Sequence, residues 1–425
     1  GLQAQETVVG MKGKGAGGGA GGLSLWVPPG GEERLRKVLA AARAGSPVWR
    51  ERLDAAGLAD AEPGGDGMPG GPRWQALPVL RKELLGSVQA GSPPFGGLLG
   101  VPVEQLARIF VSPGDVYDPQ GTDPDYWRFG KVLAAAGFER GERVLNCFSY
   151  HLTPAGFMFD AAARALGCVA VPAGVGQQDL QIRVARAVGA TGYTGLPSYL
   201  LALLDRAAAA GTPLPLRRAV VTGEPLPEAL RARIEAHGVT VRQAYGTADV
   251  GLIGYECGRG AGLHIDDGVI VEICDPDGRT LPPGEVGEVV VTALQESYPL
   301  IRFGTGDLSA LVAEPCPCGR PSARLKGWMG RVSEVTKVRG IFLYPKQLEA
   351  AMAGLAGGVQ RWRAVVERDA DHRDVLRIEF AGQADPRAVR DAVRAAVRLN
   401  PDVLVVPPGA IPADGPLFQD RRNWD

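Results

Sequence analysis

The residue types best suited to chemistry gather between positions 298 and 349. The run Phe303-Gly-Thr-Gly-Asp307 offers one carboxylate at the end of a Gly-rich strand, and the pair Gly330-Arg331 follows further along the chain. A carboxylate accepts hydrogen bonds, whereas a guanidinium donates them in a fixed fork. A lone Gly-Asp after a strand is most often only a turn, so the order of these features matters more than either one alone.

Thiol and imidazole side chains form a second candidate group. A Cys-x-Cys pair lies between the two features above, and a third cysteine and a histidine precede it. Three thiolates and one imidazole make a closed tetrahedral Zn²⁺ shell, which is structural rather than catalytic. Such soft ligands favour zinc or iron over magnesium. The alternative is that these are ordinary core or turn residues. The predicted ligands are Cys257, His264, Cys316 and Cys318, whereas Cys147, Cys168 and Cys274 lie in apolar strands as packing residues.

The elements that must position these residues alternate along the chain. Short apolar runs alternate with helical patterns, which predicts α/β layers with a largely parallel sheet. The apolar runs are 108–111, 143–148, 168–171, 192–194 and 218–221, and the helical patterns are 126–136, 156–166, 180–188, 198–210 and 228–237.

Three further segments complete the predicted organisation. Residues 1–22 end in a Gly/Ala run that buries too little to order itself, so we expect a flexible leader, with Met11 as an alternative start. Residues 23–329 form the large N-terminal domain, and a β-rich subdomain occupies about 262–329 within it. Residues 330–425 read as a separate, small α+β domain.

Composition excludes several classes of protein. The net charge of −1 gives no attraction to nucleic acid or to an anionic membrane. No apolar run reaches the length of a membrane span, and the N-terminal stretch lacks the apolar region of a signal peptide. Six cysteines in 425 residues do not make a disulfide scaffold. We therefore expect a cytoplasmic protein with reduced thiols.

Several motifs in order carry a resemblance to a known family. The motifs are Leu77-Pro-Val-Leu-Arg-Lys82, Thr194-Gly-Leu-Pro-Ser198, Thr222-Gly223-Glu224-Pro225, Ala244-Tyr245-Gly246-Thr-Ala-Asp249, Asp307 and Gly330-Arg331. Through them the segment 33–425 resembles the phenylacetate–CoA ligase branch of the AMP-forming acyl- and aryl-CoA synthetases, an adenylate-forming superfamily.

The resemblance implies a role for each matching residue. Asp249 would help to hold Mg²⁺ near the phosphate, Asp307 would bind the ribose hydroxyls, and Arg331 would face ribose and phosphate after a hinge that lets the small domain rotate. Other positions that the resemblance implies are Gly223, Glu224 and Pro225 at the adenine, Tyr245 and Gly246 beside the adenylate, Ser112 and Gly114 in the phosphate loop, and Phe148, Tyr150 and His151 in the substrate pocket. His151 has the alternative reading of a satisfied buried histidine. Some relatives carry a similar four-residue metal site.

The chain departs from the family where ATP phosphates are handled. The loop keeps Ser112 and Gly114, but Asp115 and Val116 replace paired threonines, and Pro113 removes a backbone donor. Acidic side chains at 115 and 118 would each cost about 1–3 kcal/mol at ~5 Å from a triphosphate.

The family's adenylating lysine is also absent, because Pro416 stands in its place and only Arg421 or Arg422 lies nearby. Loss of such a cation costs roughly 10²–10³ in rate. Asp249 is also one methylene shorter than the family's glutamate.

Three functions remain open from the sequence. The leading hypothesis is an AMP-forming ligase that uses ATP, Mg²⁺ and CoA to activate a small aryl or acyl carboxylate. The second is an ATP-independent acyltransferase that moves an acyl group from a CoA thioester to an acyl carrier protein, which would need no triphosphate cradle. The third is a non-catalytic binding homologue. The sequence does not settle the oligomeric state, and the resemblance implies a homodimer because many relatives are dimers.

Overall fold

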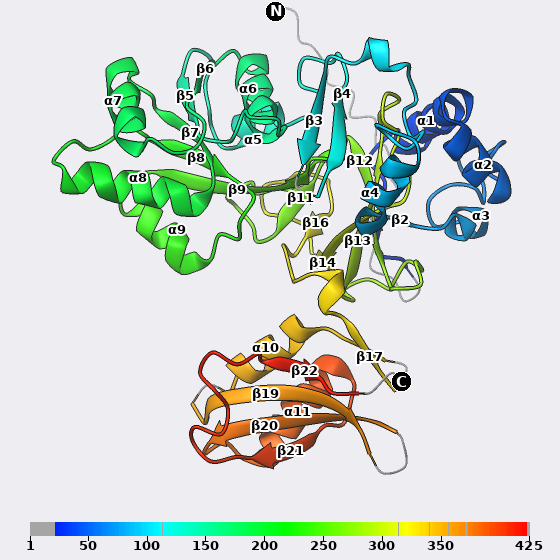
Figure 1. The fold of residues 1–425 in the computed structure, drawn as a ribbon, viewed down its shortest axis with the longest axis vertical. Coiled ribbons are helices and arrows are strands. Elements are labelled where there is room, and N and C mark those ends of the chain that lie inside the picture. The colour runs from blue at the N-terminus through cyan, green and yellow to red at the C-terminus, as the bar shows by residue number, and fades with distance from the viewer. Residues whose placement is uncertain are drawn as a thin grey trace, which may run out of the picture. The chain divides into compact units, whose positions relative to one another are not determined.

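The computed structural model describes residues 22–422, apart from 113, 313, 340, 356 and 370–372. The predicted leader therefore lies outside the described residues except for Gly22. The chain divides into two compact units between Trp328 and Met329 (Figure 1). Residue 329 thus falls on the other side of the division from where the sequence analysis placed it. Among the described residues, no helix combines the length and apolar character needed to cross a membrane.

The first unit contains a nine-stranded sheet whose central part is parallel. The order is β15-β16-β11-β10-β9-β8-β7-β5-β6, and the strands from β9 to β6 in this order run parallel. The parallel strands are β5 (Arg143–Asn146), β6 (Val169–Pro172), β7 (Gly192–Gly195), β8 (Arg218–Val221) and β9 (Thr240–Thr247). The antiparallel strands are β10 (Gly251–Tyr255), β11 (Leu263–Ile265), β15 (Leu311–Val312) and β16 (Arg324–Leu325).

Helices cover both faces of this sheet. Neighbouring residues on a strand point to opposite faces, so Val144 packs with α5 (Gly130–Ala135) and α6 (Ala155–Ala165), whereas Leu145 packs with α7 (Gln178–Val188), α8 (Pro197–Ala209) and α9 (Glu228–Glu235). The two faces thus form two separate apolar cores. This is the α/β alternation that the sequence predicts.

A five-stranded sheet forms the β-rich part of the first unit. Its order is β1-β12-β13-β14-β2, and only β14 and β2 pair in parallel. The strands are β1 (Leu25–Trp26), β2 (Leu80–Arg81), β12 (Val269–Cys274), β13 (Gly287–Ala293) and β14 (Phe303–Ser309). Both edge strands come from the N-terminal segment, before residue 82. Its apolar core includes residues of α1 (Gly31–Gly45), α2 (Pro47–Ala55) and α3 (Pro72–Ala76).

A short hairpin carries the predicted phosphate loop. β3 (Arg108–Ser112) pairs antiparallel with β4 (Val116–Gln120), and the register sets Ser112 opposite Val116. The hairpin loop thus lies between Ser112 and Val116, and Gly114 and Asp115 are its described residues. The short helix η1 (Val103–Gln105) precedes β3, and α4 (Lys82–Gly91) is tied to β4 because the Gln89 side chain bonds both backbone groups of Tyr117.

The second unit is a small α+β layer structure. Its four-stranded sheet has the order β21-β20-β19-β22, and Val389, Val393 and Val397 of one helix pack into its core at helical spacing. Its elements are η2 (Val332–Glu334), β17 (Thr336–Val338), β18 (Ile341–Leu343), α10 (Pro345–Ala353), β19 (Val359–Arg368), β20 (Asp374–Gly382), α11 (Pro386–Val397), β21 (Asp402–Val405) and β22 (Phe418–Asp420).

Candidate functional site

Asp307 lies at a junction between the two sheets of the first unit. It comes from β14, and its Oδ2 accepts a hydrogen bond of 3.0 Å from the hydroxyl of Tyr245 on β9. Its Oδ1 accepts a bond of 3.2 Å from the indole N–H of Trp328. The carboxylate is 7% exposed. Two residues 62 positions apart, which the sequence analysis assigned to one nucleotide, are therefore in direct contact.

The predicted adenine loop follows β8. Because β8 and β9 are parallel neighbours, the loop after β8 and the end of β9 meet at the same edge of the sheet. Gly223 has a φ of +85°, which a residue with a side chain adopts only under strain. Glu224 accepts a bond of 2.6 Å from the Ser198 hydroxyl at the start of α8. Gly223 to Pro225 therefore lie at the same edge of the sheet as Tyr245 and Gly246, which are close to the end of β9.

A lysine from the N-terminal region contacts the predicted magnesium ligand. The Lys82 ammonium lies 2.7 Å from the Asp249 carboxylate, whose side chain is 1% exposed against 36% for Lys82. Lys82 ends the motif Leu77–Lys82, and the family resemblance implies no role for this lysine. The signal that could have found it is a lysine at the start of a helix, although nothing local shows that α4 reaches a residue 167 positions away.

The predicted phosphate loop is a tight hairpin turn. Gly114 (φ +90°) and Asp115 (φ +58°) are exposed at its tip. The Ser112 hydroxyl donates a hydrogen bond to Asp118. Of the two predicted phosphate-loop residues, only Ser112 has a polar side chain, and its hydroxyl is already hydrogen-bonded to Asp118 within the hairpin.

Asp118 is fully buried, which differs from the expectation that it adds charge beside a triphosphate. Burial, reinforced by the negative charge of Asp249, raises the pKa of Asp118 to about 7. Near neutral pH a large share of the Asp118 carboxyl groups is thus protonated. The repulsion of a triphosphate that the sequence predicts is therefore smaller for Asp118, whereas it is unchanged for the exposed Asp115.

The predicted substrate residues have different surroundings. Phe148 is 7% exposed and stacks on Phe159 at 4.8 Å between ring centroids, so it belongs to the core under the sheet. The Tyr150 hydroxyl accepts a bond of 2.8 Å from Asn146, and burial raises the pKa of Tyr150. His151 is exposed, so the alternative reading as a buried histidine is wrong.

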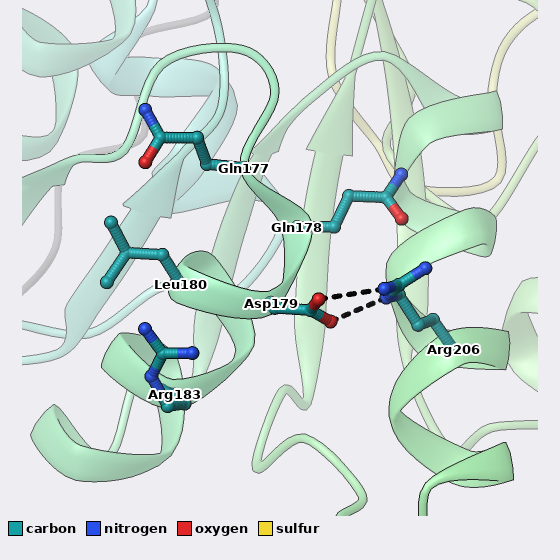
Figure 2. Close-up of a pocket in the computed structure, with 6 residues that line it drawn as sticks. All are labelled: Gln177, Gln178, Asp179, Leu180, Arg183 and Arg206. Atoms are coloured by element: carbon teal, nitrogen blue, oxygen red, sulfur yellow. Dashed lines mark hydrogen bonds and ion pairs between the residues drawn. The ribbon is translucent and has the colours of Figure 1, made fainter.

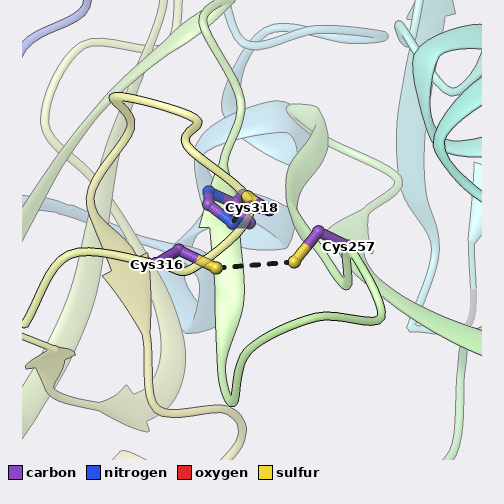
Figure 3. Close-up of side chains that lie close together, drawn as sticks. Cys257, Cys316 and Cys318 are labelled. Carbon is purple, nitrogen blue, oxygen red and sulfur yellow. Dashed lines mark hydrogen bonds between the residues drawn. The ribbon is translucent and has the colours of Figure 1, made fainter.

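The four predicted metal ligands come together. Their ligand atoms all lie within 4.8 Å of one another. The Cys257 and Cys316 sulfurs are 3.6 Å apart and face each other in Figure 3, and the Cys318 sulfur lies 3.3 Å from His264 Nε2. A disulfide needs about 2.05 Å between sulfurs, so these are thiols. The Ser322 hydroxyl lies 2.7 Å from His264 Nδ1 and orients the ring.

The protonation of this cluster suits a metal. Burial lowers the pKa of His264, which favours the neutral, ligating imidazole. Burial of Cys318 works against ionisation, yet hydrogen bonding, led by the Arg320 backbone N–H, lowers the pKa of its thiol to about 7. The donor set therefore fits a tetrahedral Zn²⁺.

The predicted residues of the second unit lie at its beginning and end. Arg331 is exposed and precedes η2, and its backbone N–H lies 3.4 Å from a Glu334 carboxylate oxygen. Arg422 is buried in this unit, where it pairs with Asp420 at 2.6 Å and Asp374 at 2.8 Å. These ion pairs explain Arg422 as part of the small unit rather than as a substitute for the missing lysine.

Two pockets lie apart from all of these residues. One, of about 470 Å³, lies at the start of α7, where Asp179 and Arg206 form a two-bond ion pair (Figure 2). The other, of about 400 Å³, includes Tyr126 and Arg128 in its lining. Neither contains a residue that the sequence analysis assigned to the site.

Comparison with known proteins identifies the family. Residues 132–295 match the model of the AMP-binding enzyme family. The chain is 33% identical over 356 residues to a phenylacetate–coenzyme A ligase of Thermus thermophilus, covering 80% of this chain and 78% of that one. It is 30% identical over 308 residues to a phenylacetate–coenzyme A ligase of Aromatoleum evansii, covering 67% and 68%. The chain belongs to the phenylacetate–coenzyme A ligase family.

A solved structure supports the fold of this ligase. An open conformation of 2-hydroxyisobutyryl-CoA ligase, in complex with 2-HIB-AMP and CoA, superposes with a TM-score of 0.74 at 23% identity, covering 91% of this chain and 90% of that one. This superposition confirms the predicted fold class, and the curated relatives above confirm the predicted family. The findings support the AMP-forming CoA ligase and give no support to the acyltransferase or the non-catalytic homologue.

Proposed function

We propose that this ligase converts a small aryl carboxylate into its CoA thioester through an acyl adenylate. A carboxylate oxygen attacks the α-phosphorus of ATP, an O–P bond forms and pyrophosphate leaves. The CoA sulfur then attacks the acyl carbon, the C–S bond forms, the bond to AMP breaks and the thiol proton is lost to solvent. The contact between Tyr245 and Asp307 carries the proposal. It holds a carboxylate, which can accept two hydrogen bonds from a ribose diol, beside the edge of the sheet from which the 223–225 loop extends.

Asp249 and Lys82 are the residues proposed to face the phosphates. Mg²⁺, when bound, would neutralise phosphate charge, and Asp249 would hold it. The Lys82 ammonium, 2.7 Å from that carboxylate, then supplies a cation from within the large unit and makes up part of the charge that Pro416 does not provide. The loop between Ser112 and Val116 is short, and the Ser112 hydroxyl already donates to Asp118, so we expect weak ATP binding and a high KM for ATP.

The aromatic surroundings of Tyr150 favour an aryl acid. Its ring meets that of Phe157 edge-on at 5.2 Å between centroids, and its hydroxyl is held by Asn146. Aromatic walls with one or two polar groups suit a flat acid. The names of the curated relatives make phenylacetate the first acid to test.

The test is ATP–pyrophosphate exchange with phenylacetate, benzoate and short aliphatic acids, followed by thioester formation with CoA. Acid-dependent exchange supports the proposal, and exchange with aryl acids above aliphatic ones supports the substrate class. D307A should abolish exchange, whereas D402A, at an exposed position of β21, should leave it unchanged. Absence of exchange with every acid at millimolar ATP would refute the proposed function.

We propose further that Cys257, His264, Cys316 and Cys318 bind a structural Zn²⁺. The chemistry of the four donors and their proximity support it. Metal analysis should find about one zinc per chain, and C316S should lose it. C168S is the matched control, because Cys168 is a buried thiol outside the cluster. Equal zinc content in C316S and wild-type protein would contradict the site.

Three expectations from the sequence stay predictions. They are the homodimer, the cytoplasmic location and the use of an acyl carrier protein. CoA is the acceptor that we propose, and size-exclusion chromatography with light scattering tests the dimer.

A further inference from the structure

Trp328 is a residue of the large unit that the family resemblance leaves without a role. Its indole N–H donates to Asp307 Oδ1 at 3.2 Å, and the residue is 41% exposed. It belongs to none of the apolar core clusters that the described residues form. Its hydrogen bond to the Asp307 carboxylate is the contact from which a role can be argued.

The backbone before Trp328 is held in place from the same strand as Asp307. The Ser309 hydroxyl on β14 donates to the Gly327 carbonyl at 2.7 Å. Gly327 has a φ of +112°, a conformation that other residues rarely adopt. Strand β14, which carries Asp307, thus also holds the backbone of the residue before Trp328 and so helps to place the Trp328 side chain next to Asp307.

The two donors hold the Asp307 carboxylate from opposite oxygens. Tyr245 bonds Oδ2 and Trp328 bonds Oδ1, at 3.0 and 3.2 Å. The plane of an aspartate carboxylate rotates easily, because its terminal torsion is broad. One donor on each oxygen fixes that plane. A vicinal diol needs both oxygens in a set direction, so the orientation of the carboxylate decides how well it recognises ribose.

We propose that Trp328 is a positioning residue for ribose recognition: its indole N–H orients Asp307 toward the 2′- and 3′-hydroxyls of the nucleotide. The inference rests on the proposed function, since it assumes that Asp307 meets a ribose. It also makes nucleotide affinity depend on the last residue of the large unit, three positions before Arg331 in the sequence.

The experiment separates the diol from the rest of the nucleotide. AMP and 2′,3′-dideoxy-AMP are titrated by calorimetry into wild-type protein and into W328F, which keeps a ring and loses the N–H. W26F is the matched control, because the Trp26 indole N–H is buried and has no hydrogen-bond partner among the described residues. W328F should bind AMP about five- to tenfold more weakly, which is within the range of an ordinary net hydrogen bond. Its affinity for dideoxy-AMP should change less than about twofold.

Each outcome decides a different question. An equal loss for AMP and dideoxy-AMP, or no loss for either, overturns the role of Trp328. Absence of AMP binding by wild-type protein refutes the proposed function instead. A second variant, W328H, keeps a ring N–H and should recover at least part of the preference for AMP over dideoxy-AMP. Failure of W328H to do so, in a folded protein, also counts against the proposal.

Discussion

Replacement of Lys82 by methionine is the sharpest perturbation of the proposed phosphate site. The change removes the charge and keeps much of the volume of the side chain. Asp249, with a side chain 1% exposed, then loses the cation 2.7 Å away. Removal of one partner from a fully buried ion pair costs about 3–5 kcal/mol. Because Lys82 is itself 36% exposed, water replaces part of its effect, and we expect a loss of about 1–3 kcal/mol in the free energy of unfolding.

K82M should lose catalytic activity even where it is fully folded. A cation that stabilises phosphate charge in the transition state contributes about 2.7–4 kcal/mol, a factor of 10²–10³ in rate. We expect ATP–pyrophosphate exchange to fall by about 10²-fold at a temperature where the variant is fully folded. Chemical denaturation and exchange are measured on the same preparation.

Lys131 provides the matched control within the same unit. Its ammonium lies 2.5 Å from Asp266, and the side chains are 36% and 0% exposed, as in the Lys82 pair. Asp266 keeps a second partner in Arg128 at 2.7 Å, so K131M should lose less stability. K131M should also keep its exchange activity. Full exchange in K82M, or an equal loss in both variants, would refute the assignment of Lys82 to the phosphates.

Further predictions concern three other parts of the large unit. The folded pKa of Asp118, about 7, lies above its unfolded value of 3.8, so the folded state binds the proton more tightly. The stability that protonated Asp118 contributes should therefore be lost as pH rises from about 4 to about 7. The difference in free energy of unfolding between wild-type protein and D118N, measured by denaturation at each pH, should shift in favour of D118N over that range. Y245F leaves one oxygen of Asp307 without its phenol donor, and its KM for ATP should rise about three- to tenfold with little change in kcat; an unchanged KM contradicts the shared ribose site. C316S should unfold at a lower temperature than wild-type protein, and a zinc chelator should lower the melting temperature of wild-type protein but not of C316S.

The structure also shows where sequence reasoning about the site reached its limit. Phe148 and Tyr150 lie two positions apart in one predicted pocket, yet Phe148 packs into the core beside Phe159. The direction of a side chain after a strand depends on how the strand pairs and on which helix covers it. Likewise Asp118 reads as a surface charge in the sequence, and only the packing of the hairpin removes it from water.

By itself, the sequence determined the family, the alternation of strands and helices and the identity of the four metal-ligand candidates. These follow from local periodicity and from the order of short motifs, which need no knowledge of distant contacts. The tertiary structure alone decided that Tyr245 and Trp328 hold Asp307 and that Lys82 pairs with Asp249. The physical reason is that these contacts join separate sheets and helices. They form only when whole sheets and helices pack against one another, and a local sequence pattern does not predict that packing.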